Sequence, residues 1–216
     1  MIRSKTDKTA VLYFSLSPSA EAKVKTFADE QDFQTNVTIA KLMREHVLRQ
    51  IKRSELPFAI FDEKNQKGRS FGEKLSNAYE ALFDEGFQYV IAVGNDTPQL
   101  RADHLTRADN ALQRGIPLVL GPATDGGVWL MGLSKSTFEA SLLKSISWKK
   151  GSVYSELTKS FGPVRQTLVL ERLGDIDHSV DLDDFLNNRS ASTDISRLRQ
   201  IITVMIALTI IYPQQP

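Results

Sequence analysis

The sequence predicts an α/β fold with a mostly parallel central sheet. Short apolar segments of strand length alternate along the chain with longer amphipathic segments of helix length, an order typical of such sheets. Two short apolar segments, at 89–93 and 118–121, are each followed by a turn that carries an aspartate. Strand ends of this kind are where α/β proteins place their chemistry. A chain of 216 residues fits one domain with a substantial core.

Composition narrows the classes of function. The 27 Lys and Arg residues nearly balance 26 Asp and Glu residues, so no general basic surface exists for nucleic acid or anionic lipid. The absence of cysteine excludes disulfides, thiolate zinc sites and cysteine nucleophiles, and the three histidines are too scattered for a histidine metal cluster. Because the first residues lack the apolar core of a secretion signal, we expect a cytoplasmic protein that holds any anionic ligand locally.

The first half of the chain predicts one crossover unit, followed by a further helix and strand. Residues 9–16 form the first strand, and Pro57–Phe61 forms a short second one. Between them, Asn36 can cap a helix with one apolar stripe. Residues 71–85 then predict a strong helix that leads into a strand at 87–93. The stripe of the earlier helix consists of Val37, Ala40, Met43, Val47 and Ile51.

The second half continues the alternation. A helix is expected at 102–114, ended by Gly115, followed by a strand that starts at Leu118. Further strands are expected at 128–133 and 167–173. No repeat, low-complexity block or linker interrupts the pattern, so residues 1–200 are expected to form a single domain.

The C-terminal apolar run at 201–212 does not fit the alternation. It falls well short of the roughly 20 residues of a membrane-spanning helix. Its richness in Ile, Val and Thr favours a buried strand, although a core helix remains open. We expect residues 201–216 to be a tail docked on the domain or at a contact between subunits of a homo-oligomer, and a role at a membrane surface is the weaker alternative.

Asp96 is the first candidate for chemistry. Gly94 and Asn95 permit a tight turn and Pro98 prevents the strand from continuing, so the carboxylate stays at the carboxyl edge of the sheet. Mg²⁺ and Mn²⁺ prefer one or two carboxylates together with substrate phosphate oxygens. An equally good explanation is an Asx turn in which the side chain bonds the backbone of Gln99.

The segment Asp125-Gly126-Gly127 offers a second carboxylate beside two glycines. Adjacent glycines let a backbone approach a ligand closely and leave N–H groups free to meet oxygen atoms. A hairpin turn explains the same residues, and that reading is favoured for the motif alone. Trp129 just beyond it suits core packing better than a stacking platform.

Two further segments add polar groups. Asp175 and Asp177 would point the same way in an extended strand and could complete a cation site with Asp96, whereas the acids that follow at 181–184 suit a helix start. In the loop before the helix at 71–85, Gly68 and the helix N-terminus could receive an anionic or ribose-bearing group beside Arg69. A polar loop with a helix cap is the favoured alternative there.

Taken in order, these motifs resemble those of a bacterial family whose members look like GT-A glycosyltransferases. They are also similar to the guanylyltransferases of molybdenum-cofactor and phospholactate metabolism. The resemblance spans roughly residues 9–186, and its most specific part is the glycine-rich block at 121–127. It rests on Gln66-x-Gly68, Phe71-Gly72-Glu73-x-Leu75, Gly94-Asn95-Asp96-Thr97-Pro98-x-Leu100, Gly121-Pro122-Ala123-x-Asp125-Gly126-Gly127, Trp148 and Asp175-Ile176-Asp177. The implied fold is a three-layer α/β/α nucleotide-diphospho-sugar transferase of the GT-A type.

The resemblance also implies roles for individual residues. Asp96 corresponds to the metal-binding aspartate at the sheet edge, and Asp177 to a second carboxylate near the same Mg²⁺ or Mn²⁺. Asp125, a catalytic candidate with Asp96, would contact the sugar or acceptor side. The remaining implied donor-binding residues are Lys23, Lys25, Gln66, Gly68, Gly126 and Gly127.

The sequence departs from the family pattern in the first loop. Leu16 stands where the family usually has a lysine, and Phe27 stands where it has an arginine. Lys23, Lys25 and Thr26 remain, and His178 replaces a common threonine. Losing two cations weakens a diphosphate site, because charge-assisted contacts to phosphate are stronger than neutral ones.

Three hypotheses follow. The leading one is a metal-dependent transferase, most similar to a glycosyltransferase, that takes a nucleotide sugar or nucleoside triphosphate and an unknown acceptor. Within it, nucleotidyl transfer of the guanylyltransferase type is an alternative. The second is a degenerate member that binds a ligand or partner without turnover, which the missing cations favour. The third gives the C-terminal run a membrane-surface or assembly role.

Overall fold

The computed structural model describes residues 8–28, 32–148, 150–161, 167–187 and 193–211. Within these ranges the chain forms six strands in one sheet and eight helices. The strands are β1 Thr9–Phe14, β2 Phe58–Phe61, β3 Tyr89–Val93, β4 Leu118–Pro122, β5 Val128–Ser134 and β6 Thr167–Val169.

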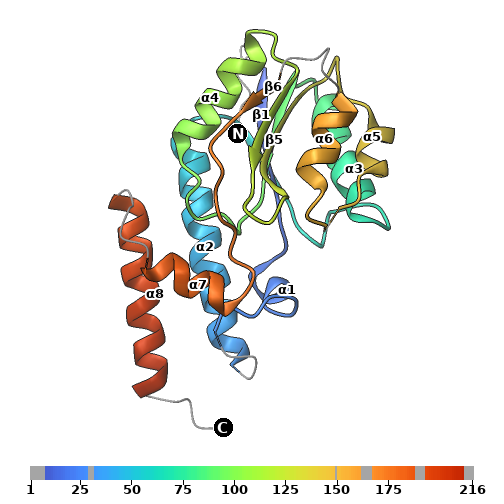
Figure 1. Ribbon diagram of the computed structural model, residues 1–216. Coiled ribbons are helices and arrows are strands. Elements are labelled where there is room, and N and C mark those ends of the chain that lie inside the picture. Colours follow the sequence, from blue (N-terminus) through green and yellow to red (C-terminus); the bar gives the residue numbers. More distant parts are fainter. Residues whose placement is uncertain (1–7, 29–31, 149, 162–166, 188–192, 212–216) are drawn as a thin grey trace.

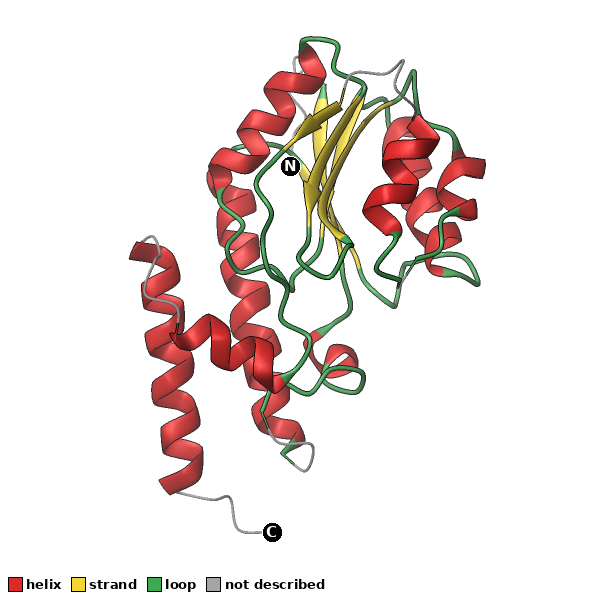
Figure 2. Ribbon diagram, viewed as in Figure 1, coloured by secondary structure: helices red, strands yellow, loops and turns green. Residues whose placement is uncertain are grey.

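The sheet is mostly parallel. Its strand order is β2-β1-β3-β5-β4-β6, and only β5 runs antiparallel to its neighbours β3 and β4. The strand ends of β1 and β3 therefore lie at the same edge as the turn between β4 and β5 (Figure 2). This arrangement brings the loops that follow Phe14, Val93 and Pro122 together at one edge.

Helices cover both faces of the sheet, so the architecture is a three-layer α/β/α sandwich. In Figure 1, α2 and α4 lie on one face, and α3, α5 and α6 lie on the other, while α7 and α8 pack beside the lower part of α2. The helices are α1 Pro18–Glu21, α2 Phe33–Arg53, α3 Phe71–Asp84, α4 Ala102–Gln113, α5 Ala140–Ser145, α6 Val153–Phe161, α7 Ser179–Asn187 and α8 Thr193–Ile211.

The alternation of side chains along β1 divides the core into two layers. Val11 and Tyr13 are fully buried in the core that contains α2 and α4, whereas Leu12 and Phe14 are buried in the core that contains α3, α5 and α6. Successive residues of a strand point to opposite faces, so a fully apolar strand is what a sheet covered on both sides requires.

The helix α3 begins and ends as its sequence predicts. Ser70 caps it, with its hydroxyl accepting the Glu73 N–H, and the Glu73 carboxylate accepts the N–H of Ser70 in return. Gly86 follows the last turn with a φ of 96°, a left-handed conformation that favours glycine. The predicted helix at 102–114 and the strands near 9, 57, 87, 118 and 128 are likewise confirmed.

The predicted cap at Asn36 is wrong. The helix α2 begins four residues earlier than that cap implies, at Phe33, and Asp32 caps it by accepting the Thr35 N–H at 2.9 Å. Asn36 lies inside the first turn, and its buried side-chain Oδ1 accepts the N–H groups of Phe27 and Ala28, each at 2.9 Å. The side chain therefore fixes the preceding loop and does not start the helix.

The C-terminal apolar run is a helix, and the strand reading was wrong. Ile195, Leu198 and Ile202 are buried against α2 and α7, while Ile201 and Val204 are 43% and 51% exposed. This spacing of three and four residues is helical, and β-branched composition alone pointed the other way. Since α8 runs from 193 to 211, it passes without a break through the predicted tail boundary at 200. None of the helices in the described ranges is long and apolar enough to cross a membrane.

The strand predicted at 167–173 is shorter than expected. The strand β6 pairs with β4 only over Thr167–Val169, after which the chain keeps single backbone contacts along β4. The Leu173 N–H donates to Pro122 O at 3.1 Å, so the segment still follows the edge of β4 toward the carboxyl end of the sheet.

Candidate functional site

A cavity of about 720 Å³ lies at the carboxyl edge of the sheet. The ends of β1 and β3 form its floor, and the β4–β5 turn, the start of α3 and the segment before α7 complete its wall. Asp96, Asp125 and Asp177 all contribute to the lining, together with Lys25 and Gln66. The motifs that the sequence singled out separately therefore meet in one place.

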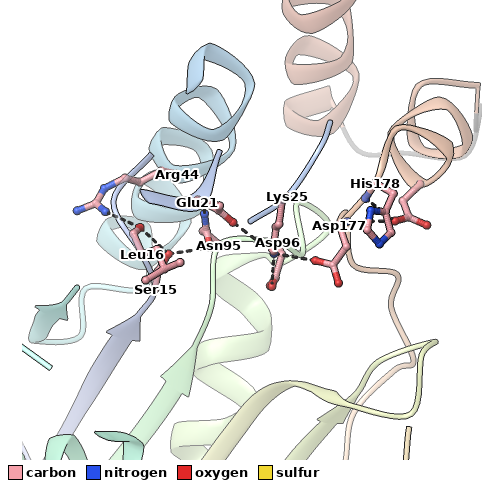
Figure 3. A network of polar contacts seen from close by, with 10 residues as sticks. Ser15, Leu16, Glu21, Lys25, Arg44, Asn95, Asp96, Asp177 and His178 are labelled. Carbon is pink, nitrogen blue, oxygen red and sulfur yellow. Dashed lines mark hydrogen bonds and ion pairs between the residues drawn. The ribbon is translucent and has the colours of Figure 1, made fainter. Parts of the chain in front are cut away.

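The centre of this site is the ammonium group of Lys25. Its Nζ lies 2.9 Å from Asp96 Oδ2, 2.7 Å from Asp177 Oδ1 and 3.3 Å from Glu21 Oε1. Figure 3 shows the Lys25 side chain between the two aspartates. Asp96 and Asp177, which are far apart in sequence, thus direct their carboxylates at the same point.

Glycine allows Asp96 to take this position. A Cβ on Gly94 would lie 2.9 Å from Asp96 Oδ1, closer than such contacts normally occur. The glycine after β3 therefore leaves room for the carboxylate to fold back over the strand end. Two buried side chains hold the neighbouring Asn95. Its Oδ1 accepts the Ser15 hydroxyl at 2.7 Å, and its side-chain amide donates to Glu21 (Figure 3).

Asp177 is held by backbone contacts on both sides. The Ile176 N–H donates to Asp96 O at 2.8 Å, which ties this segment directly to the loop after β3. The Asp181 carboxylate in the first turn of α7 accepts the N–H groups of Asp177 and His178. The acidic helix start is thus a cap, as predicted, while the segment around Asp175 is not the extended strand that we expected.

The charges of the network depend on one another. Burial alone would lower the pKa of Lys25, but the carboxylates of Asp96, Glu21 and Asp177 raise it overall, so the side chain stays protonated. Burial opposes ionisation of Asp96, yet the Lys25 ammonium holds the pKa of that carboxyl below its ordinary value. Burial raises the pKa of Glu21, and the Lys25 charge opposes this rise only in part.

Asp175 lies in the field of the same carboxylates. Burial and then the nearby charges of Asp125, Asp96 and Asp177 raise its pKa to about 6. The edge of the sheet therefore carries more carboxylates than the single ammonium of Lys25 can neutralise. Close carboxylates of this kind either take up a proton or attract a cation.

The chemistry of these donors fits a hard divalent cation. Asp96 and Asp177 already direct two carboxylate oxygens at one cationic nitrogen. Among the described residues, no group of three or more acids or histidines could hold a metal ion. Two carboxylates are nevertheless sufficient for Mg²⁺ when water and substrate phosphates supply the other ligands.

Asp125 lies on the β4–β5 turn with its side chain exposed at the cavity. Its Oδ1 accepts the Gly127 N–H at 2.7 Å, an Asx turn that uses this N–H group. Gly126 has a φ of 90°, and a Cβ there would lie 2.1 Å from Gly151 O. The geometry of the turn therefore explains both glycines, and their contacts with a ligand stay a prediction.

The other predicted binding residues differ in their access to the cavity. Gln66 lines it and donates its amide to Ser15 O and Phe61 O, at 2.9 and 3.0 Å, so it also joins β1 to β2. Gly68 has a φ of 133° and packs against Glu73 outside the lining. Lys23 is exposed and likewise lies outside the lining, so a phosphate contact there requires an extended ligand.

Three backbone amides at the start of α3 are used by its own cap. The Glu73 carboxylate accepts the N–H groups of Arg69 and Ser70, and the Ser70 hydroxyl accepts that of Glu73. The cap explanation therefore accounts for this helix start. Trp129 is buried, with its indole N–H donating to Glu171 O at 3.1 Å, which confirms the packing reading.

Sequence reasoning missed Glu21, Ser15 and the role of Asn95. Glu21 ends the short helix α1 four residues before Lys25, and this i, i+4 spacing of opposite charges was a usable signal. Nothing in the local sequence indicates that Ser15 reaches Asn95, because that hydrogen bond joins the ends of two adjacent strands.

Comparison with known protein families adds observations that do not depend on the structure. A sequence profile of a family described as an uncharacterized protein conserved in bacteria, DUF2064, matches residues 23–150. None of the curated proteins matches the chain.

Three solved structures resemble the chain to different degrees. A "putative nucleotide-diphospho-sugar transferase" from Desulfovibrio desulfuricans G20 is 21% identical, with a TM-score of 0.76 over 94% of this chain and 98% of that chain. Rv0371c from Mycobacterium tuberculosis H37Rv is 14% identical (TM-score 0.48, 91% and 100% covered). A cytidylyltransferase from Leptospira borgpetersenii serovar Hardjo-bovis is also 14% identical (TM-score 0.48, 97% and 98% covered). The first of these likenesses shows that the fold is of the GT-A type.

Proposed function

We propose that this chain, which belongs to the bacterial family DUF2064, is a metal-dependent transferase that uses a nucleotide-activated donor, and specifically a glycosyltransferase. The fold is shared with a structure named for nucleotide-diphospho-sugar transfer. The observation that carries the proposal is the Lys25 ammonium between Asp96 and Asp177, which marks a cation position inside the cavity.

The excess of carboxylates supports a divalent cation at this position. Three carboxylates surround Lys25, so a nucleotide diphosphate would meet net negative charge at the sheet edge. Bound by Asp96 and Asp177, Mg²⁺ or Mn²⁺ would neutralise the diphosphate or pyrophosphate that leaves in the reaction. Cation and donor would therefore bind together, with each weakened in the absence of the other.

The residues of the chain have distinct tasks in this proposal. Asp96 and Asp177 orient the donor through the cation that they hold. Lys25, which stays protonated, turns from the carboxylates toward the phosphate oxygens, where a charge-assisted contact is strong. Asp125 faces the sugar or the acceptor from the β4–β5 turn.

A thermal-shift experiment tests the proposal. The melting temperature is measured with UDP-, GDP-, CDP-, ADP- and dTDP-sugars and with the nucleoside triphosphates, each with and without Mn²⁺. Specific binding raises the melting temperature by mass action. We expect a Mn²⁺-dependent rise with one base, which is lost in Asp96→Asn and kept in Asp184→Asn, an exposed α7 carboxylate outside the cavity.

A product-release assay with the same compounds, together with the binding data, separates the alternatives. Release of a nucleoside diphosphate from a nucleotide sugar supports glycosyl transfer, whereas release of pyrophosphate from a triphosphate supports nucleotidyl transfer. A nucleotide that binds equally well without Mn²⁺ and to Asp96→Asn would contradict the metal-dependent enzyme. That result would instead support a degenerate, binding-only member, which the loss of cations at Leu16 and Phe27 favours.

A further inference from the structure

A second part of the same cavity is aromatic. The Phe71 ring lies 5.0 Å from the Trp148 ring and packs edge-on against Phe14 at 5.5 Å. All three side chains line the cavity, and Phe71 is 37% exposed although it is a large apolar residue. An apolar ring held at a cavity wall and left open to solvent can take the flat face of a ligand.

Glycine fixes the position of Trp148. Its indole N–H donates to Leu143 O at 2.7 Å. A Cβ on Gly72 would lie 2.8 Å from the indole nitrogen and 2.6 Å from that same carbonyl oxygen. The indole therefore fits against α3 only because residue 72 has no side chain, and the ring is held in one orientation at the cavity. This preorganised ring loses little freedom when a ligand binds.

Three cations line the same cavity as the aromatic pair. Arg69, Lys74 and Lys150 line the cavity close in sequence to Phe71 and Trp148. Within the described part of the chain, none of the three takes part in an ion pair, whereas Lys25 contacts three carboxylates. The Glu156 carboxylate accepts the Ser152 hydroxyl and the Ser147 N–H, and these hydrogen bonds lower its pKa, with a smaller effect from the charge of Lys150. The positive charge here is available to a ligand.

We propose that this aromatic and cationic part of the cavity binds the acceptor, and that the acceptor carries a phosphate or carboxylate group beside a flat apolar portion. The inference rests on the proposed function, because an acceptor exists only if the protein transfers a group. The two parts of the cavity need ligands of opposite character. The carboxylates near Lys25 favour a cation, and the cations that line the cavity beside Phe71 favour an anion.

Binding of small probes tests this inference without any donor. Isothermal titration calorimetry is carried out with phenyl phosphate, benzoate, inorganic phosphate and benzyl alcohol. We expect phenyl phosphate or benzoate to bind more tightly than the neutral alcohol, and more tightly than phosphate alone. Arg69→Gln combined with Lys74→Gln should weaken the binding of that probe about tenfold or more, because charge-assisted contacts are lost.

Matched variants separate this inference from the proposed function. Lys67→Gln, an exposed lysine of the same loop outside the cavity, should bind the probe like the wild type. Asp96→Asn should also keep probe binding, whether or not nucleotides bind. Equal binding to the wild type and the Arg69/Lys74 double variant would overturn the inference, as would no binding of any probe. Loss of Mn²⁺-dependent nucleotide binding in the double variant would assign these cations to the donor and overturn it as well.

Discussion

Lys25 Nζ lies 2.7 Å from Asp177 Oδ1, and this ion pair joins the loop after β1 to the segment that precedes α7. The same nitrogen contacts Asp96 at the end of β3 and Glu21 in α1. One side chain therefore connects the loop after β1, with its short helix α1, to the end of β3 and to the segment before α7. Because the side chain of Lys25 is only 18% exposed and that of Glu21 only 2%, little water can reach these charged groups if a partner is removed.

Lys25→Met should destabilise the protein. The change leaves three carboxylates close together without their counter-charge. Breaking a fully buried ion pair costs about 3–5 kcal/mol, and the expected loss here is about 1–3 kcal/mol, because Asp96 and Asp177 keep part of their surface in water. Urea denaturation at pH 7 measures the free energy of unfolding.

The matched control for this change is Lys23→Met. Lys23 lies in the same loop but is exposed and outside the cavity, so its replacement should change the stability by less than about 0.5 kcal/mol. Added Mn²⁺ should restore part of the stability of Lys25→Met, since an ion bound by the native carboxylates stabilises the fold by mass action. Equal stability of the two variants would show that Lys25 does not hold the site together.

Gly121→Ala should be destabilising through a contact that no local pattern reveals. A Cβ on Gly121 would lie 2.4 Å from Cε2 of the buried Trp129. Overpacking of this kind typically costs about 1–3 kcal/mol. Trp129→Leu in the Gly121→Ala background should recover part of the loss, and a double-mutant cycle of thermal unfolding measures the coupling. Gly174→Ala, whose nearest contacts would be an ordinary 3.8 and 3.9 Å, is the control.

The sequence predicts the parts of the fold that depend on local patterns. The cap at Ser70 and the terminator Gly86 could be recognised because each satisfies helix-end groups within a few residues. The run after Ile201 could not be assigned from composition. Its helical stripe begins upstream at Ile195, and β-branched side chains favour strands only when no such stripe competes.

The sequence indicates candidate residues for the site but not their contacts. Asp96 and Asp177 were expected to share Mg²⁺ or Mn²⁺, which stays a prediction, and in the structure both carboxylates contact the Lys25 ammonium. Lys25 was expected to contact a phosphate group of the donor, whereas in the structure its ammonium group contacts these aspartates. Glu21 was missed altogether. The distances between these residues are set by where the loop after β1 returns to the sheet edge, which depends on packing that neither the local composition nor the periodicity records.

His46 should lower the free energy of unfolding as the pH drops below about 6.5, an effect that the raised pKa of Asp175 opposes. This histidine is 1% exposed, and burial, followed by the charge of Arg49, lowers its pKa below the ordinary value of 6.5. The unfolded state therefore binds a proton first as the pH falls through 6.5, and stability is lost from that pH downward at up to about 1.4 kcal/mol per unit.

His46→Leu should flatten this dependence between pH 7 and 5.5. His104, whose pKa burial also lowers, contributes in the same direction, so His46→Leu should remove only part of the histidine contribution. The free energy of unfolding is measured by urea denaturation at several pH values, with the difference between pH 7 and 5.5 as the readout. An unchanged difference in His46→Leu would show that His46 is protonated equally well in the folded state.

The helix α8 provides a matched pair of neighbouring isoleucines. Ile202 is fully buried against α2 and α7, while Ile201 is 43% exposed. Ile202→Ala removes buried methyl groups and should cost about 2–5 kcal/mol, whereas Ile201→Ala should change the free energy of unfolding by less than about 0.5 kcal/mol. Thermal unfolding and urea denaturation measure both variants.

The comparison decides whether α8 is part of the folded domain. If α8 unfolds together with the sheet, Ile202→Ala lowers the single unfolding transition that all probes report. If α8 were only loosely attached, Ile202→Ala would leave the main unfolding transition unchanged, and only the helical signal of α8 would be lost at a lower temperature. The packing of Ile195, Leu198 and Ile202 on α2, together with the ion pair between Arg53 and Asp194, supports the first outcome.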